Sequence, residues 1–278
     1  MTRTIHVAHS PDSDDAFMFY ALAEGKIDTG DLRYVHELQD IETLNQRALR
    51  AELEVTAVSI HAYAYLADRY ALLPHGASMG DHYGPRLVAR EPMSREDVRG
   101  KRIAIPGPLT SAFLALRLYE PDFVPVPTAF DVIEDAVERG EVDLGLLIHE
   151  GQLTFADRGL HLVADMGEWW FTESGLPLPL GGNVIRKDLG EALIKEISRH
   201  LRASIAYGLK HRTGALDHAM QFARGLERSR ADTFVGMYVN DWTLDYGDRG
   251  REAVRLFLER GHEAGFVPKR VQVEFVDD

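Results

Sequence analysis

The 278-residue sequence contains no cysteine. Disulfide bonds, thiolate metal ligands and a cysteine nucleophile are therefore excluded. An excess of positive charge is also missing, because 31 Lys and Arg residues face 44 Asp and Glu residues and give a net charge of −13. Nucleic-acid binding requires clustered basic side chains, so we expect no nucleic acid as a partner. An anionic ligand would have to be bound by local groups.

Long apolar runs are absent as well. No stretch approaches the roughly 20 residues that cross a membrane, and residues 1–7 lack the apolar segment of a signal peptide. We therefore expect no membrane insertion and a cytoplasmic location. A chain from which a signal peptide had been removed would have the same N-terminus.

Several cofactor and catalytic motifs are missing. The sequence has no G-x-G-x-x-G fingerprint, no Walker loop and no G-x-S-x-G elbow, so NAD, ATP and ester hydrolysis have no motif support. His149-Glu150 does not begin a zinc-protease motif, because Leu153 stands where the second histidine is required. We expect no cofactor and no metal, and the sequence does not indicate an oligomeric state.

What the sequence does contain is an alternation of short apolar strands with helical segments. Strands are expected at residues 5–9, 55–59, 85–90, 102–105, 123–127, 142–148 and 183–185. Helices are expected at residues 16–24, 40–53, 62–67, 112–119 and 131–139, and residues 189–265 are predominantly helical. This alternation predicts an α/β protein with parallel sheets covered on both faces.

Two breaks divide the chain into two predicted lobes. Pro92 and the Pro/Gly-rich residues 177–182 are the expected crossings. The first lobe would comprise residues 1–90 plus 184–278, and the second residues 91–183. Each lobe would have a central, mainly parallel sheet with flanking helices, and the ligand cleft would lie between the lobes.

Two loops after predicted strands offer polar groups, and ligands of open α/β sheets bind at such positions. Thr110 and Ser111 begin a helix whose backbone N–H groups suit a carboxylate, although either residue could simply cap the helix. Residues 10–15 instead place Asp12, Asp14 and Asp15 at a helix start. These acids would repel an anion and suit ligand hydroxyl groups, or they could serve only as capping residues.

His149 follows an apolar strand and is the best acid–base candidate, because a neutral imidazole accepts a proton near physiological pH. The alternative is a buried histidine held by structural hydrogen bonds. Asn45 on an apolar helical face and Ser59 at a strand end could bind a ligand or satisfy backbone groups. Trp169-Trp170 could stack on an aromatic ligand or pack between the lobes.

Four stretches together carry a family resemblance: SPDSDDAFMFYAL (10–22), DIETLN (40–45), GEVDLGLLIHE (140–150) and GLPLPLG (175–181). In order and spacing they resemble the 1,4-dihydroxy-6-naphthoate synthases of the futalosine route to menaquinone. The resemblance covers most of the chain. It implies a type II periplasmic-binding-protein-like fold and a cytosolic lyase, without metal or organic cofactor, that converts cyclic dehypoxanthine futalosine to 1,4-dihydroxy-6-naphthoate.

The resemblance also implies roles for individual residues. It places the proposed catalytic histidine at His149 and makes the substrate a small carboxylated molecule. The expected substrate-binding residues are Ser10, Asp14, Asn45, Ser59, Thr110 and Ser111. One departure is that the family commonly reads Ser-Pro-Cys-Pro-Asn-Asp where this chain has acids at residues 12–15. Negative charge there disfavours a carboxylated ligand unless the acids turn away or contact its hydroxyl groups.

Three functions remain open from the sequence. In the leading hypothesis His149 removes a proton from the sugar-derived part of the substrate, and a carbon–carbon bond breaks as the second ring aromatises. The second hypothesis is a solute-binding protein for a small organic anion, which needs the same two lobes but no base. The third is chorismate dehydratase, a sister activity on the same fold.

Overall fold

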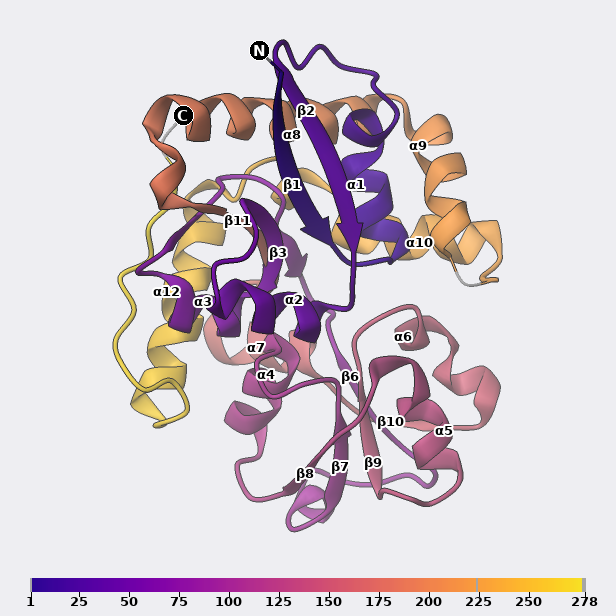
Figure 1. Cartoon of the computed structure of the whole chain (residues 1–278). Coiled ribbons are helices and arrows are strands. Elements are labelled where there is room, and N and C mark those ends of the chain that lie inside the picture. The colour runs from indigo at the N-terminus through magenta and orange to yellow at the C-terminus, as the bar shows by residue number, and fades with distance from the viewer. Residues whose placement is uncertain (1, 224, 277–278) are drawn as a thin grey trace.

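The computed structural model describes residues 2–223 and 225–276, which form two lobes, each built on one sheet (Figure 1). Lobe A contains a sheet with strand order β2-β1-β3-β11-β4, and β5 pairs with β11. Its strands are β1 (Arg3–His9), β2 (Leu32–Leu38), β3 (Val55–Ser59), β4 (Tyr70–Leu72), β5 (Ser78–Gly80) and β11 (Leu178–Arg186). Lobe B contains a sheet with strand order β10-β6-β9-β7-β8. Its strands are β6 (Arg86–Ala89), β7 (Arg102–Ile105), β8 (Val124–Pro127), β9 (Leu144–Leu147) and β10 (His161–Asp165).

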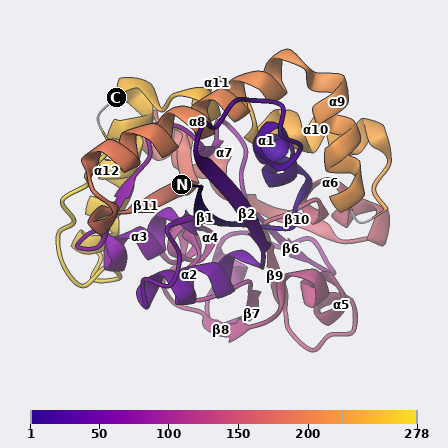
Figure 2. The same ribbon diagram turned by 45° about the horizontal axis from the view of Figure 1, so that its top comes forward.

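Helices cover both sheets. Lobe A has α1 (Ser13–Ala23), α2 (Ile41–Leu49), α3 (Ile60–Leu66), α8 (Glu191–Lys210), α9 (Arg212–Ala219), α10 (Arg228–Tyr238), α11 (Asp241–Leu244) and α12 (Gly247–Glu263). Lobe B has α4 (Ser111–Tyr119), α5 (Ile133–Glu138), α6 (Gly151–Thr154) and α7 (Met166–Ser174). Short 3₁₀ turns lie at Glu96–Val98, Phe130–Val132, Phe155–Arg158, Lys187–Leu189 and Met220–Phe222. Figure 2 shows α1, α9 and α10 gathered on one side of the molecule and α3 and α12 on the other.

The α/β class is confirmed, but the sheets are mixed rather than mainly parallel. Strand β1 is parallel to β2 and β3, and β7 is parallel to β8 and β9. Strand β11 is antiparallel to β3, β4 and β5, and β6 is antiparallel to β9 and β10. The reason is that β6 and β11 each follow a crossing between the lobes, whereas a parallel neighbour requires a helical crossover within one lobe.

Strand pairing also moves both expected lobe boundaries. Strand β6, expected in the first lobe, pairs with β9 in lobe B. The start of β11, expected in the second lobe, pairs with β5 and β3 in lobe A. The chain therefore crosses at residues 81–85 and again at residues 175–177. Pro92 lies just beyond the end of β6, within lobe B, and does not mark a crossing.

One apolar core joins the two lobes along one side. It includes Leu66 of α3, Leu87 of β6, Leu114 of α4 and Leu258 of α12, all buried. A separate cluster lies beneath sheet A against α8, and another lies within lobe B. Because buried apolar area contributes roughly 25 cal/mol per Å², this shared core holds the lobes together on the side of α3, α4 and α12. The polar cleft residues lie elsewhere, at the strand ends.

No helix within residues 2–223 and 225–276 combines the length and apolar character that a membrane span needs.

Candidate active site

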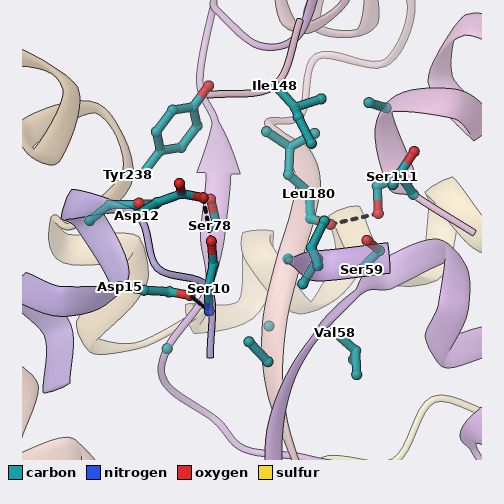
Figure 3. Close-up of a pocket in the computed structure, with 18 of the residues that line it drawn as sticks. Ser10, Asp12, Asp15, Val58, Ser59, Ser78, Ser111, Ile148, Leu180 and Tyr238 are labelled. Carbon is teal, nitrogen blue, oxygen red and sulfur yellow. Dashed lines mark hydrogen bonds between the residues drawn. The ribbon is translucent and has the colours of Figure 1, made fainter. Parts of the chain in front are cut away.

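A cavity of about 790 Å³, including the part open to solvent, lies between the lobes. It receives residues from the β1–α1 loop, the end of β3, the start of α4 and the middle of β11. Figure 3 shows Ser59 and Ser111 on one side, with Ser10, Asp12 and Asp15 on the other. The cavity therefore has two chemically different polar ends, with apolar residues such as Ile148 and Leu180 between them.

The first end is the N-terminus of α4. Thr110 caps this helix, since its Oγ1 accepts from the Phe113 N–H at 3.2 Å and donates to the Gly107 carbonyl at 2.8 Å. Ser111 Oγ donates to the Leu180 carbonyl at 2.6 Å and accepts from the His61 N–H at 3.1 Å. Both hydroxyl groups are thus held by the fold. The groups that can bind an anion here are the first-turn backbone N–H groups, which have no partner within a helix.

Ser59 completes this end, and Asn45 orients it. Asn45 Nδ2 donates to Ser59 Oγ at 3.1 Å, and the Ser59 N–H donates to Asn45 Oδ1 at 2.9 Å. Asn45 is fully buried and does not line the cavity. Because Ser59 Oγ accepts from Asn45, its own O–H can donate to a ligand. Asn45 therefore lies one contact behind the cavity wall.

The second end is the acidic loop, residues 10–15, which leads from β1 into the first turn of α1. Ser10, Asp12, Asp14 and Asp15 all line the cavity. The Ser10 N–H donates to Asp15 Oδ2 at 2.7 Å, and Ser10 Oγ donates to Asp12. Although Asp12 occupies the N-cap position of α1, its side chain makes no capping hydrogen bond. The acids therefore face the cavity, which capping alone does not explain.

Burial changes the ionisation of two of these acids. It raises the pKa of Asp15 to about 7, against a hydrogen bond from the Ser10 N–H and with help from the charge of Asp12. It raises the pKa of Asp14 well above its usual range, and the charges of Asp15, Asp12 and Glu150 act in the same direction. A protonated Asp14 donates a hydrogen bond. This end of the cavity can therefore donate to oxygen atoms as well as accept from hydroxyl groups.

His149 lies beside the cavity and does not line it. Its Nδ1 accepts from the Gly151 N–H at 3.0 Å, and its Nε2 lies 2.9 Å from the Phe130 carbonyl, which can only accept. In these contacts Nδ1 is therefore the acceptor, and the proton lies on Nε2. Its neighbour Ile148 lines the cavity, and Glu150 accepts from Ser13 Oγ at 3.1 Å across the lobes. His149 thus lies directly behind the wall of this cavity.

Five of the seven expected site residues line one cavity: Ser10, Asp14, Ser59, Thr110 and Ser111. Sequence reasoning missed Ser78, Asn183, Phe234 and Tyr238, which line the same cavity. Phe234 and Tyr238 belong to α10, whose sequence pattern predicts a helix but does not indicate that the helix lines the cavity. The Tyr238 hydroxyl donates to Gln152 Oε1 of lobe B at 2.7 Å. No periodicity signals that α10 reaches across the cleft.

The residues that the structure describes contain no group of three His, Asp or Glu side chains arranged as metal ligands. This includes the acidic loop, where the carboxylates instead accept hydrogen bonds from Ser10.

Comparison with known proteins gives a consistent result. The profile of a family described as menaquinone biosynthesis matches residues 5–263. A 1,4-dihydroxy-6-naphthoate synthase from Thermus thermophilus is 42% identical over 256 residues, which cover 92% of this chain and 93% of that protein. A crystal structure of a protein from Archaeoglobus fulgidus is 49% identical with a TM-score of 0.92, covering 95% of this chain and 98% of that one.

More distant solved structures establish the fold. The periplasmic aliphatic sulphonate binding protein from Escherichia coli superimposes with a TM-score of 0.65 at 13% identity, covering 100% of this chain and 95% of that one. This confirms the expected periplasmic-binding-protein-like fold. The sequence resemblance is confirmed too, and because the family match spans most of its length, the chain belongs to the menaquinone biosynthesis family.

Proposed function

We propose that the protein is a cytoplasmic carbon–carbon lyase that converts cyclic dehypoxanthine futalosine to 1,4-dihydroxy-6-naphthoate. The name of the Thermus relative supports the product. The single structural observation that carries the proposal is the two-ended cavity, with helix N–H groups and Ser59 at one end and Ser10 with Asp14 at the other. A substrate with a carboxylate at one end and hydroxyl groups at the other fits this arrangement.

The carboxylate of the substrate binds at the start of α4 in this proposal. There the positive end of the helix dipole and the free N–H groups favour a negative charge. The Ser59 hydroxyl adds a donor that Asn45 holds in place. The sugar-derived part then lies against Ser10 and Asp14. This orientation keeps the carboxylate away from the acidic loop and removes the conflict between an acidic cavity wall and an anionic substrate.

His149 is the proposed base. It takes a proton from the sugar-derived part, and the carbon–carbon bond to that part breaks as the second ring becomes aromatic. To do so, the imidazole must turn into the cavity that it does not line, and Nδ1 must exchange the Gly151 N–H for the substrate proton. Gly151 is the first residue of α6, so its N–H is a first-turn group that water can satisfy. Losing such a bond costs only about 1 kcal/mol, and the cavity supplies orientation.

The decisive test incubates the purified protein separately with cyclic dehypoxanthine futalosine and with chorismate, and follows both by liquid chromatography and mass spectrometry. We expect 1,4-dihydroxy-6-naphthoate from the first and no change in the second. Turnover of chorismate would instead identify a dehydratase. Conversion of neither, combined with tight binding of another small organic anion, would identify a solute-binding protein.

A variant tests the proposed base. His149→Ala should lose turnover while product binding, measured by calorimetry, stays within a few-fold of the original. Near-normal turnover in this variant would exclude His149 as the base and leave the overall reaction standing.

A further inference from the structure

A second cavity lies beside the first, and His149 faces it. Its empty volume, including the part open to solvent, is about 1000 Å³. Its lining includes Glu134 of α5, His149, Glu150, Thr154 of α6 and, from lobe A, Glu227 and Arg230. The proposed reaction involves His149 but gives this cavity no role. A proton on the imidazole can leave through it without passing the ligand.

Glu134 is the unexplained carboxylate of this cavity. Its side chain is nearly buried, and its Oε1 has no hydrogen-bond partner among the described residues. Its Oε2 lies 3.8 Å from Arg158 Nη1. A buried carboxylate oxygen without a partner is costly, so such a group usually serves a purpose. Burial raises the pKa of Glu134, while the charges of Arg158 and His149 oppose that rise.

Gly151 brings Glu134 and His149 together. A Cβ built on this glycine would lie 3.0 Å from Glu134 Oε2 and 3.0 Å from His149 Cε1. Both groups therefore pack against the bare Cα of Gly151. Any larger residue would push the carboxylate, the imidazole or both away. The glycine thus permits a close approach of an anionic group to the imidazole.

Other charged groups lie near His149, and each has a further partner or position of its own. Glu150 Oε2 lies 4.0 Å from His149 Nδ1, but its Oε1 accepts from Ser13 across the cleft. Arg158 makes its short contacts with Glu138 and Asp135 at the surface. In the facing part of lobe A, Arg230 pairs with Asp157, and Glu227 lines the far wall. Glu134 differs from these groups because its buried Oε1 accepts no hydrogen bond from the described residues.

We propose that Glu134 is a positioning residue for His149, whose carboxylate stabilises the imidazolium that forms when His149 takes up a proton. The inference rests on the proposed function, in which His149 is the base. In that step a C–H bond of the substrate breaks, an N–H bond forms at Nδ1, and the electron pair remains with the substrate. Glu134 neither gives nor takes a proton in this step, and the proton later passes to water in the second cavity.

The kinetic test compares Glu134→Gln with Glu138→Gln. Glu138 lies on the same helix and also contacts Arg158, but it does not line the cavity. We expect Glu134→Gln to lower kcat about threefold with KM changed less than twofold, because stabilisation of the imidazolium is lost only as it forms. The acidic limb of the pH profile should move to lower pH by about half a unit, since a nearby anion favours the protonated imidazole. Glu138→Gln should leave both unchanged.

A second measurement does not need turnover. In protein labelled with ¹⁵N-histidine, the His149 signals are assigned by their loss in His149→Gln and followed as the pH is changed. Glu134→Gln should move the midpoint of these signals to lower pH, in the same direction as the kinetic limb, and Glu134→Asp should restore most of it. If Glu134→Gln does not fold, Gly151→Ala provides the same readout, because the added Cβ separates the two groups.

The outcomes separate the two proposals. A shifted midpoint without any turnover of the substrate would support the role of Glu134 and reject the proposed function. Normal turnover with an unchanged midpoint and an unchanged kcat in Glu134→Gln would reject the role of Glu134 and leave the function intact. Equal effects of Glu134→Gln and Glu138→Gln would show a general effect of helix charge and would also overturn the inference.

Discussion

At the scale of single residues, Asp15 makes stability depend on pH. Its pKa is about 7 in the folded protein and lies near the ordinary value of 3.8 when the chain is unfolded. Between these values the folded state binds more protons than the unfolded state, so the free energy of unfolding falls as pH rises from about 4 to 7. The contribution of Asp15 protonation to the free energy of unfolding is fully present below pH 4 and is lost above pH 7.

Replacing this acid should remove its share of the pH dependence. Asp15→Asn keeps an oxygen that can accept from the Ser10 N–H. We expect the variant to be more stable than the original protein at pH 8. Between pH 5 and 7, its free energy of unfolding should fall less steeply with pH, by up to about 1 kcal/mol per pH unit. Urea denaturation at several pH values measures this. Asp248→Asn, an exposed acid in the first turn of α12, is the control. Parallel curves for Asp15→Asn and the original would contradict the prediction.

The expected site residues that line the cavity share one property. Ser10, Asp14, Ser59, Thr110 and Ser111 all lie where a strand ends or the next helix begins. For Asn45 and His149, the sequence could not show that the side chains lie behind the cavity wall. Whether a side chain reaches the cavity or stops one contact behind it depends on distant partners, such as the Phe130 carbonyl that holds His149. No local pattern encodes that contact.

At the scale of elements, α4 is the part of the site whose formation can be tested directly. The Thr110 cap satisfies the Phe113 N–H and fixes the first turn of the helix. Thr110→Ala should lower the free energy of unfolding by about 1 kcal/mol and weaken product binding, because the anion-binding turn is less ordered. Thr110→Ser, which retains the hydroxyl, should restore both in urea denaturation and calorimetry. An alanine variant as stable as the serine variant would argue against the cap.

Element prediction worked for segments with strong periodicity and missed several short or weakly patterned strands. The expected helices at 112–119 and 131–139 correspond to α4 and α5. Strands β2, β4, β5 and β10 were not predicted, whereas the edge strand β8 was expected at residues 123–127. Strand β2 has a single buried residue, and β4 and β5 have only three residues each. Their sequences therefore lack the continuous apolar run that identified β9.

At the scale of the whole molecule, the lobes are joined by apolar packing on one side and by polar contacts on the other. The polar contacts on that second side include Tyr238 with Gln152, Ser13 with Glu150, and Arg230 with Asp157. Hydrogen bonds between the lobes can be replaced by hydrogen bonds to water at little cost in free energy, whereas exposing a shared apolar core to water is costly. Opening should therefore break the polar contacts and pivot about the core between α3, α4 and α12.

Tyr238→Phe tests this motion. Without the bond to Gln152, we expect the ligand-free protein to have a larger radius of gyration in small-angle X-ray scattering, and product to bind about fivefold more weakly. The product-bound form should keep its original dimensions. Tyr34→Phe removes a comparable hydroxyl contact, with His200 inside lobe A, and should change neither. Identical scattering from both variants would mean that the polar contacts do not control opening.

The insertion of β11 between β3 and β4 also has a consequence for synthesis of the chain. Lobe B is complete once residues 86–174 have emerged, so it can fold while lobe A still lacks its central strand. Until β11 arrives, β3 and β4 present bare edges that invite pairing with other chains. A ribosome that stalls before residue 178 would therefore release a polypeptide with one finished lobe and one aggregation-prone half. The folding of the N-terminal strands of lobe A therefore depends on a strand that is synthesised after lobe B.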